Sequence, residues 1–508
     1  MFDWTRISDW IPSITSPERK LNFNEKAKWT LVILVSFFVL GQINVWGVNQ
    51  TAIARFEFLE IVFGSRFGSL ITLGIGPIVT ASIILQLLVG SQIINWDTTT
   101  DEGRKKFSSA NKILAVAFCI IEAIAYVLAG AVPPATPDTF LMVAIILQLT
   151  AGGLVIIFMD EVISKWGFGS GVSLFIAAGV AKTILLRTLN PFTQQGTLPI
   201  AGELPAGIIP GFFASFLEGT PLFFSLLPLL ATIVVFLLVA YIQQIRIEIP
   251  MAFSMPFGKF AARRWPLKLL YTSNIPVILT GAIIANMQAL GRILYDRGID
   301  ILGTYNDSGQ VQSGIMYYLS TPSGNVGIII VTLMASLFAL LFIILGVRVW
   351  KKHVLKMSLV GAILGLVVGS LLIPIYNLPS IAVGDVTRSI VYMSVFVIGS
   401  VIFSIFWVHT SGMDSKSVAE QFKQYSLMIP GFRHDPRIVE RVLDRYIPAL
   451  TVIGGAFVGF LAAFSDLTSA LGTGTGILLS VMIVYQLYEQ ITTQHKDDIP
   501  PIIRRFMG

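Results

Sequence analysis

Long apolar stretches without any charged residue recur along the chain and dominate its pattern. Nine stretches hold no Asp, Glu, Lys or Arg, namely 29–54, 67–96, 139–159, 219–245, 269–291, 308–347, 357–384, 446–465 and 467–488. A helix needs about 20 apolar residues to cross a bilayer, so each stretch can span a membrane. Together with less uniform segments, the pattern predicts twelve spans near 27–48, 74–93, 113–131, 139–159, 170–188, 223–244, 271–290, 326–347, 357–376, 389–409, 447–465 and 472–488.

Lys and Arg fall on alternate sides of these spans, as the positive-inside rule requires. Cations gather in the predicted inner segments, such as Arg104 to Lys112 and Lys416 to Arg445, whereas the outer loop from Thr188 to Thr220 has none. Two exceptions, Arg292 and Arg297, lie just outside the seventh span. The pattern therefore predicts that both termini are cytoplasmic.

The composition agrees with a membrane protein. Of the 508 residues, 54% are hydrophobic and 13% are charged, compared with roughly 25% charged in a soluble globular chain. The net charge of +6 would favour a nucleic-acid partner in a soluble protein, but in a membrane protein it sets orientation. The single cysteine, Cys119, excludes a disulfide framework and is interpreted as a packing residue.

Two segments outside the spans have patterns of their own. Residues 1–26 are too polar for a signal-peptide core, so the N-terminal segment is expected to be retained, with Phe2 to Ile11 forming a short amphipathic helix on the cytoplasmic surface or an extended tail. Residues 54–67 mix Arg and Glu with large apolar side chains and are too short to cross. A re-entrant half-helix lining a cavity and an interfacial helix lying flat both fit this segment.

The residue patterns that enzymes and pumps use are missing. The four histidines lie in separate segments without metal-ligand spacing, and Gly179 to Thr183 lacks the glycine that a phosphate loop places before its lysine. Glu122 is the clearest ionisable residue inside a span, while Lys182 and Arg187 lie toward the outer end of theirs. A secondary transporter usually needs several polar groups near the midplane, so one glutamate favours that class only weakly.

Several long motifs resemble the SecY family, and more closely its archaeal and eukaryotic branch, the alpha subunit of the translocon. They are Leu70-Ile-Thr-Leu-Gly-Ile-Gly-Pro-Ile-Val-Thr-Ala-Ser82, Lys165-Trp-Gly-Phe-Gly-Ser-Gly171, Ser273-Asn-Ile-Pro276, Phe406-Trp-Val-His-Thr-Ser-Gly-Met-Asp414, Arg445-Tyr-Ile-Pro448 and Gly472-Thr-Gly-Thr-Gly476. The motifs follow one another in order over nearly the whole chain. The resemblance implies a passive channel for unfolded polypeptide that is neither an enzyme nor cofactor-dependent.

The resemblance also implies the architecture, an all-α polytopic membrane protein with two inverted pseudo-symmetric five-helix halves around an hourglass pore. The expected parts are a cytoplasmic segment at 1–26, a first half at 27–188, an external loop at 189–222, a second half at 223–490 and a cytoplasmic tail at 491–508. The first half includes a re-entrant plug helix at about 55–67, with Phe56, Leu59, Val62, Phe63 and Phe67 as its apolar residues. The second half contains an extra two-helix hairpin at about 324–380, for which no function is predicted.

Matching the family's constriction residue by residue implies a pore ring of six aliphatic side chains, namely Ile75, Val79, Val172, Ile176, Ile278 and Leu479. Branched apolar side chains in a narrow ring resist wetting and make no specific bond to a passing chain. The match also implies a polar cluster of Thr80, Glu122 and Asn286 at the seam of a lateral gate. Hydrogen bonds across helices in lipid contribute about 1–2 kcal/mol at most, so such a cluster can latch and still open.

The resemblance implies several partners. The cytoplasmic loops 245–270 and 410–446 match regions that contact the ribosome in relatives, with Arg263, Arg264 and Arg433 as the expected contacts, because guanidinium groups bind phosphate in bidentate fashion. Two small membrane subunits, a SecE-type (gamma) clamp and a Sec-beta subunit, are expected, together with signal sequences, nascent polypeptides and membrane lipid. The expected residence is a prokaryotic, archaeal cell membrane. The main alternative function is a secondary transporter with inverted repeats.

Overall fold

The structure is a computed structural model. It describes residues 12–49, 66, 68–90, 93–96, 100–128, 130–193, 197–199, 204–217, 223–254, 260–272, 275–306, 311–322, 327–335, 337–338, 354–375, 382–424, 427–428, 436–472 and 474–494. Within these residues, six helices are long and apolar enough to cross a membrane by length and composition, and three shorter apolar helices accompany them. The helical membrane class predicted from the sequence is confirmed, and the count of twelve spans stays a prediction.

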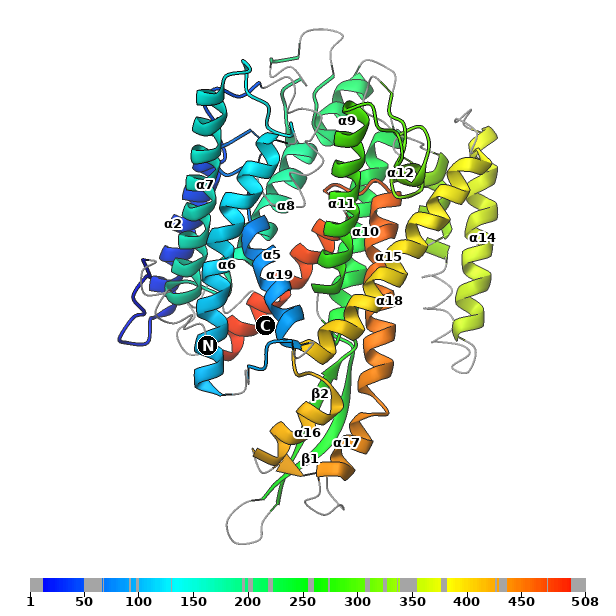
Figure 1. Ribbon diagram of the computed structural model, residues 1–508. Helices are drawn as coiled ribbons and strands as arrows, with labels where there is room; N and C mark the ends of the chain where they lie inside the picture. Colours follow the sequence, from blue (N-terminus) through cyan, green and yellow to red (C-terminus); the bar gives the residue numbers. More distant parts are fainter. Residues whose placement is uncertain are drawn as a thin grey trace.

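The first half consists of helices that lie together on one side of the molecule, coloured blue to blue-green in Figure 1. They are α2 (Phe23–Leu40), α5 (Gly76–Gly90), α6 (Asp101–Leu128), α7 (Thr139–Trp166) and α8 (Gly171–Leu189). Neighbours in the chain pack together, since α5 contacts α6, α6 contacts α7 and α7 contacts α8. A buried apolar cluster with Cys119 at its centre joins α5, α6 and α7, which confirms that Cys119 is a packing residue.

The second half lies beside the first (Figure 1). Its long helices are α10 (Leu227–Gln243), preceded by the 3₁₀ turn η2 (Phe223–Leu226), then α11 (Ile275–Asp296), α15 (Val383–Thr410), α18 (Ile447–Leu467) and α19 (Gly474–Gln494). The last helix, α19, contacts α8 of the first half as well as α10 and α18. The two halves are therefore joined along α8 and α19.

Helices α6 and α7 continue well beyond the predicted spans at 113–131 and 139–159. The cations Arg104, Lys105, Lys106 and Lys112, which were expected in a loop, lie on the first turns of α6, and α7 runs on to Trp166. Lys and Arg are good helix formers, and a span that leaves the bilayer can continue as a helix in water. Apolar length fixes the membrane crossing but not the end of the helix.

Small residues form a close helix contact in the second half, between α15 and α18. A Cβ added to Gly455 would lie 2.3 Å from the hydroxyl of Ser404, and one added to Gly459 would lie 2.7 Å from the carbonyl of Phe396. Two serine hydroxyls of α15, those of Ser400 and Ser404, are fully buried in this contact. Small residues let helix backbones approach closely in lipid, where no hydrophobic force drives helices together.

Three further helices were either not predicted or predicted only in part. The predicted external loop at 189–222 contains α9 (Ile208–Leu217), which the sequence analysis did not identify, and a short helix, α12 (Ile315–Tyr318), precedes the inserted hairpin. Within the hairpin, α14 (Val354–Ile375) packs on the helical residues 327–335 through Gly365 and Gly369, whose added Cβ atoms would lie 2.3 Å and 2.8 Å from backbone atoms of Met334 and Val331. Figure 1 shows α14 at the edge of the bundle.

One end of the bundle carries a small protrusion that contains the only strands among the described residues. Strands β1 (Arg246–Ser254), β2 (Phe260–Lys268) and β3 (Leu427–Met428) form an antiparallel sheet in the order β2-β1-β3. Helices α16 (Ser415–Gln424) and α17 (Pro436–Leu443) pack beside the sheet (Figure 1). The sheet was not predicted, and the pairing of β3 with β1 joins the predicted loops 245–270 and 410–446.

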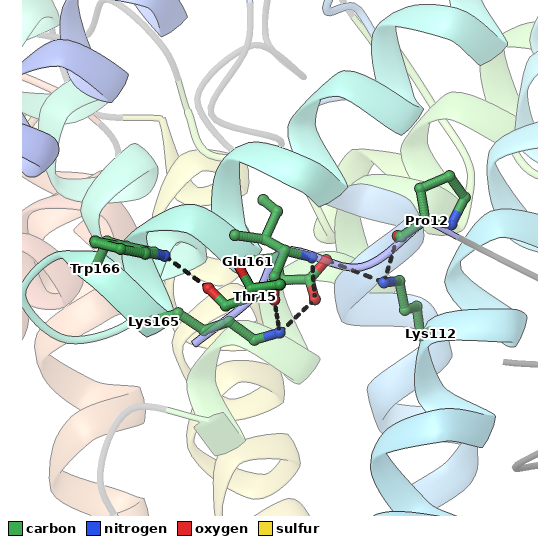
Figure 2. A network of polar contacts seen from close by, with 7 residues as sticks. Pro12, Thr15, Lys112, Glu161, Lys165 and Trp166 are labelled. Atoms are coloured by element: carbon green, nitrogen blue, oxygen red, sulfur yellow. Dashed lines mark hydrogen bonds and ion pairs between the residues drawn. The ribbon is translucent and has the colours of Figure 1, made fainter. Parts of the chain in front are cut away.

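The first described residues lie against Lys112 of α6 and the last turns of α7, and Figure 2 shows the polar network that holds them. Glu161 of α7 pairs with Lys112 of α6 at 3.0 Å and with Lys165 at 2.8 Å. The Lys112 ammonium also donates to the carbonyl of Pro12, and the Trp166 indole donates to that of Thr15 at 2.9 Å. Residues 12–15 are thereby bound to both helices, while Phe2 to Ile11 lie outside the described residues.

Candidate functional site

A cavity of about 250 Å³ lies between helices of the two halves, and aliphatic side chains make up most of its wall. The lining residues come from α5 and the turn before it, from α8, α11 and α19, and from Phe403 of α15. Few polar groups reach the wall, among them Thr80, Asn286 and Thr475. Among the described residues, such a wall offers few groups that could replace the water around an ion or a polar solute.

Five of the six predicted pore-ring residues line this cavity, namely Ile75, Val79, Ile176, Ile278 and Leu479. The sixth, Val172, does not line it, and its side chain packs partly buried against the main apolar core. The match to the family's constriction therefore predicted residues that meet in one cavity wall although they lie up to about 400 positions apart in the chain. The sealing function of the ring stays a prediction.

A carboxylate fixes the start of the helix that carries Val172 and Ile176. Asp160 of α7 accepts a hydrogen bond from the Val172 backbone N–H at 2.9 Å. The first N–H groups of a helix have no partner within the helix, and a negative charge is favourable at that end. Asp160 therefore positions the first turn of α8 directly against α7.

A second carboxylate does the same for the helix that carries Leu479. Asp466 of α18 accepts from the Gly474 backbone N–H at 2.5 Å and from the Tyr392 hydroxyl of α15 at 2.8 Å. The glycine is required here, because a Cβ on Gly474 would lie 2.0 Å from the carbonyl oxygen of Ala462. Asp466 thus ties α15, α18 and α19 together.

The sequence analysis missed both carboxylates, although a signal for them exists. Each is an acidic residue at the end of a charge-free stretch, and a Gly-x-Gly-x-Gly run that starts the next span follows at 167–171 or 472–476. A buried carboxylate costs free energy unless hydrogen-bond donors surround it, and the unpaired N–H groups of a helix start are such donors. An acid that ends a charge-free stretch and precedes a glycine-rich helix start therefore predicts a cap from the preceding helix.

The predicted gate cluster is divided between the two halves. Thr80 of α5 hydrogen-bonds to the carboxyl of Glu122 on the neighbouring helix α6, so this pair lies within the first half. Asn286 of α11 lines the cavity together with Thr80. Oxygen Oε2 of Glu122 is buried and has no hydrogen-bond partner among the described residues. The cluster stands at the boundary of the halves, and its function as a latch stays a prediction.

The predicted plug lies outside the described residues, since Phe56, Leu59, Val62, Phe63 and Phe67 are all in the segment that the structure leaves undescribed. The described residue at its end, Arg66, donates to the side-chain oxygen of Gln42 at 2.9 Å. Backbone bonds from Val45 to Gly68 and from Leu70 to Ile43 then fix the chain where it enters the cavity wall. After the undescribed segment, the chain therefore pairs with the residues that directly follow α2.

Two of the three predicted ribosome contacts, Arg263 and Arg264, lie on strand β2 of the protrusion. Arg264 on β2 is exposed, and its guanidinium binds the Glu248 carboxylate of β1 at 2.7 Å, which raises the pKa of Arg264 through that hydrogen bond and the neighbouring charge. Arg263 lies next to it on β2, and Arg433 lies outside the described residues. On the same strand, Trp265 packs edge-on against Phe422 of α16, with ring centroids 4.8 Å apart. The protrusion therefore has a small apolar core of its own and a charged outer face.

No group of three or more His, Cys, Asp or Glu side chains that could hold a metal ion occurs within the described part of the chain. The features on which the site rests are instead an apolar cavity at the boundary of two helical halves and two capped helix starts in its wall.

Comparisons with known proteins match this arrangement. A family model for SecY covers residues 69–488. A protein translocase subunit SecY from Methanothermobacter thermautotrophicus is 41% identical over 504 residues, which are 98% of this chain and 97% of the relative. The counterpart from Methanocaldococcus jannaschii is 39% identical over 502 residues, with 99% and 98% covered. The chain belongs to the SecY family. The resemblance stated from the sequence motifs is therefore confirmed.

Solved SecY-type structures agree over the same length. A structure described as that of a protein conducting channel superposes with a TM-score of 0.73 at 38% identity, and 98% of each chain is covered. A SecY structure concerned with the plug domain gives 0.71 at 38% identity, and Sec61 in the canine ribosome-channel complex gives 0.71 at 39%, again with 98% of each chain covered. The fold predicted for the SecY family is thereby confirmed, and the channel class is favoured over a secondary transporter.

Proposed function

We propose that this chain is the channel-forming subunit of a protein translocase in an archaeal cell membrane. It conducts unfolded polypeptide across the membrane and releases transmembrane segments sideways into lipid, without catalysing a reaction of its own. The observation that carries this proposal is the aliphatic cavity between the halves, because five predicted ring residues from four separate segments line it. The relatives from two archaea, both translocase subunits, support the membrane assignment.

The cavity suits a passive conduit. A translocating polypeptide carries every kind of side chain. A wall with many hydrogen-bonding groups would bind the polar side chains and slow the passage of the polypeptide. Aliphatic side chains offer close contact without such preferences, and an apolar constriction opposes hydrated ions by remaining dry. Direction must then come from outside the channel, from translation or from a separate motor.

Partners form the second part of the proposal. The exposed Arg264 on the protrusion supports docking to ribosomal RNA phosphate, as does the solved Sec61 complex with a ribosome, and Arg263 and Arg433 complete the proposed contact. A SecE-type subunit and a Sec-beta subunit are proposed to cover membrane-facing helices. Both termini are proposed to be cytoplasmic, on the side of the protrusion.

Site-specific crosslinking to a stalled nascent chain tests the conduit directly. A photo-reactive residue at Val79 or Ile278, both in the cavity wall, is expected to crosslink to a translocating chain. The matched control is Ile363 of α14, an exposed aliphatic residue on the inserted hairpin, which should give no crosslink. Equal crosslinking from all three positions, or none from the cavity positions, would overturn the proposed path.

Deleting Phe56 to Phe67 tests the proposed plug. Reconstituted vesicles carrying the shortened chain should leak ions faster than vesicles with the full chain, because only the apolar ring then remains to close the path. Conductance that stays at the level of the full chain would refute the plug assignment while leaving the conduit untouched.

Polar substitution tests the ring. The variants Ile75→Asn and Ile278→Asn place amide groups in the cavity, where they favour water and should loosen both the seal and the discrimination between strong and weak signal sequences. The matched control is Val172→Asn, since Val172 is the ring candidate that does not line the cavity. The cavity variants should therefore leak more than the control.

A further inference from the structure

The seam between α6 of the first half and α11 of the second is closed by small and apolar side chains. Ala285 of α11 is buried in a cluster whose other buried members all come from the first half, including Ala123 and Val127 of α6. Ala289 and Ile293, one and two turns further along α11, pack partly buried against the same cluster. These three residues follow the four-residue spacing of one helix face, and the next position on that face is Arg297.

Helix α11 ends in a glycine cap that fixes the place of Arg297. Gly298 has a φ of +82°, in the left-handed region that favours glycine. Its N–H donates to the carbonyl of Tyr295 at 2.9 Å, and the N–H of Ile299 donates to that of Leu294 at 2.9 Å. These two bonds define a Schellman motif, in which the residue before the glycine is the C-cap. Arg297 is that residue, so its backbone is held at a defined point.

Helix α6 ends in the same way at the neighbouring end of the seam. Gly130 has a φ of +79°, its N–H donates to the carbonyl of Val127 at 3.2 Å, and the N–H of Ala131 donates to that of Tyr126 at 2.9 Å. A Schellman motif satisfies two of the last four carbonyl groups of a helix and leaves the later ones without a partner from the motif. The carbonyl of Leu128 is one of those left over.

The guanidinium of Arg297 donates a hydrogen bond to this carbonyl. Its Nη2 donates to the Leu128 oxygen at 3.1 Å, across the boundary between the two halves. A cation at a helix C-terminus is favourable because the carbonyl ends of the helix carry partial negative charge. The contact therefore combines a charge-assisted hydrogen bond with the dipole of α6, at the place where the apolar face of α11 ends.

About three turns from its start, α6 is bound within its own half. Lys112 pairs with Glu161 of α7 and donates to the carbonyl of Pro12, as Figure 2 shows. Helix α6 is thus bound to α7 at Lys112 and meets the end of α11 through Arg297 at its C-terminus. Parting the two halves at Arg297 leaves the contacts of Lys112 in place.

We propose that Arg297 is a positioning residue that latches the lateral seam at its outer end, by holding the C-terminus of α6 against the end of α11. The proposal rests on the proposed channel function, in which this seam opens to lipid. It also explains why a cation stands on the outer side of the seventh span, against the positive-inside rule: Arg297 serves α6 rather than the orientation of α11. Loss of the latch shifts the seam toward its open state.

Thiol labelling of the seam tests the latch without requiring translocation. The full chain carrying Ala285→Cys is reconstituted into liposomes and treated with N-ethylmaleimide, and modification at each cysteine is followed by mass spectrometry. Ala285 is buried in the closed seam, so its labelling rate reports opening. Adding Arg297→Ala should raise that rate roughly two- to fivefold, the range expected for one exposed cation at a helix end.

Two controls make the outcome decisive. Arg187→Ala removes an exposed arginine from the last turn of α8, away from this seam, and should leave the rate unchanged. The native Cys119, which is fully buried, reports general loosening and should stay unlabelled in every variant. The latch is refuted if Arg297→Ala labels no faster than Arg187→Ala, or if Cys119 labels in parallel with position 285. The labelling experiment does not depend on a translocating chain. A negative result in the crosslinking experiment would therefore count against the conduit and not against the latch.

Discussion

The turn from α7 to α8 and the turn from α18 to α19 occupy equivalent places in the two halves, and acidic side chains hold both. In the first half two neighbours divide the task, since Asp160 caps α8 while Glu161 binds Lys112 of α6. In the second half Asp466 alone caps α19 and binds Tyr392 of α15. With the inserted hairpin left aside, α6 and α15 are the third spans of their halves. Each turn therefore ties the third, fourth and fifth spans together.

The difference between the two turns follows from their surroundings. Lys112 and Glu161 keep 17% and 16% of their side-chain surface exposed, so both charges can reach water while they pair. Tyr392 is 6% exposed, and a lysine in its place would have to lose its water. The second half uses a neutral hydroxyl instead. The same mechanical connection is thus made with an ion pair where water is near and with a hydroxyl where it is absent.

Of the four changes, removing Asp466 should lower the stability of the protein most. Asp466→Ala leaves the Gly474 N–H and the Tyr392 hydroxyl without an acceptor, at about 1–3 kcal/mol for each donor and about 2–6 kcal/mol together. The melting temperature of the detergent-solubilised protein is the measurement, with Asp444→Ala, an exposed aspartate near α17, as the control. Equal melting temperatures for the two variants would mean that Asp466 does not stabilise the fold.

Removing only the tie to the third span separates the two tasks of Asp466. Tyr392→Phe keeps the cap on α19 and removes one hydrogen bond to a carboxylate, which costs about 1.5–3 kcal/mol. Tyr241→Phe, on an exposed tyrosine of α10, is the matched control and should melt with the native protein. A Tyr392→Phe protein that melts like this control would confine the function of Asp466 to capping.

Removing Asp160 should cost less, because Glu161 keeps the tie to α6. Asp160→Ala takes away an N-terminal cap, which is worth about 0.5–2 kcal/mol, and Asp160→Asn should restore part of it by keeping an acceptor. Thermal melting of both variants beside Asp466→Ala measures the contrast. The division of tasks in the first half is wrong if Asp160→Ala is as damaging as Asp466→Ala.

The smallest effect is expected at the ion pair. Lys112→Met keeps the apolar stem of the side chain and removes the charge, with a cost of about 0.2–1 kcal/mol for a pair that reaches water. Raising the salt concentration should narrow the difference from the native protein, whereas Tyr392→Phe should show no salt dependence. Lys105→Met, on an exposed lysine of the same helix, supplies the control. A salt-independent loss at Lys112 would contradict the contrast between the two turns.

Much of the fold could be predicted from the sequence because the bilayer imposes a simple rule. Stretches without charge, such as 139–159 and 447–465, lie within helices of the structure. The family motifs then brought Ile75, Ile278 and Leu479 to one cavity, although no periodicity links them. Apolar length predicts spans, and motif order predicts which spans meet.

What the sequence did not reveal depends on partners in space. The β1 and β2 segments read as a charged loop, since their pairing depends on a turn and on β3, which lies more than 150 residues away. Asp160 and Asp466 read as span boundaries, because the N–H groups that bind them belong to the next helix. Arg297 read as an exception to a charge rule, and only the end of α6 beside it gives it a partner.

The protrusion has a mechanical consequence. All four of its connections to the membrane region run to the second half, since β1 follows α10, β2 precedes α11, α16 follows α15 and α17 precedes α18. Pairing of β1 with β3 and the apolar cluster around Phe422 make it a single lever rather than two separate loops. A force applied to the protrusion by a bound partner is therefore transmitted first to the second half. Such a load passes on to the first half through contacts between the halves, such as that of α8 with α19.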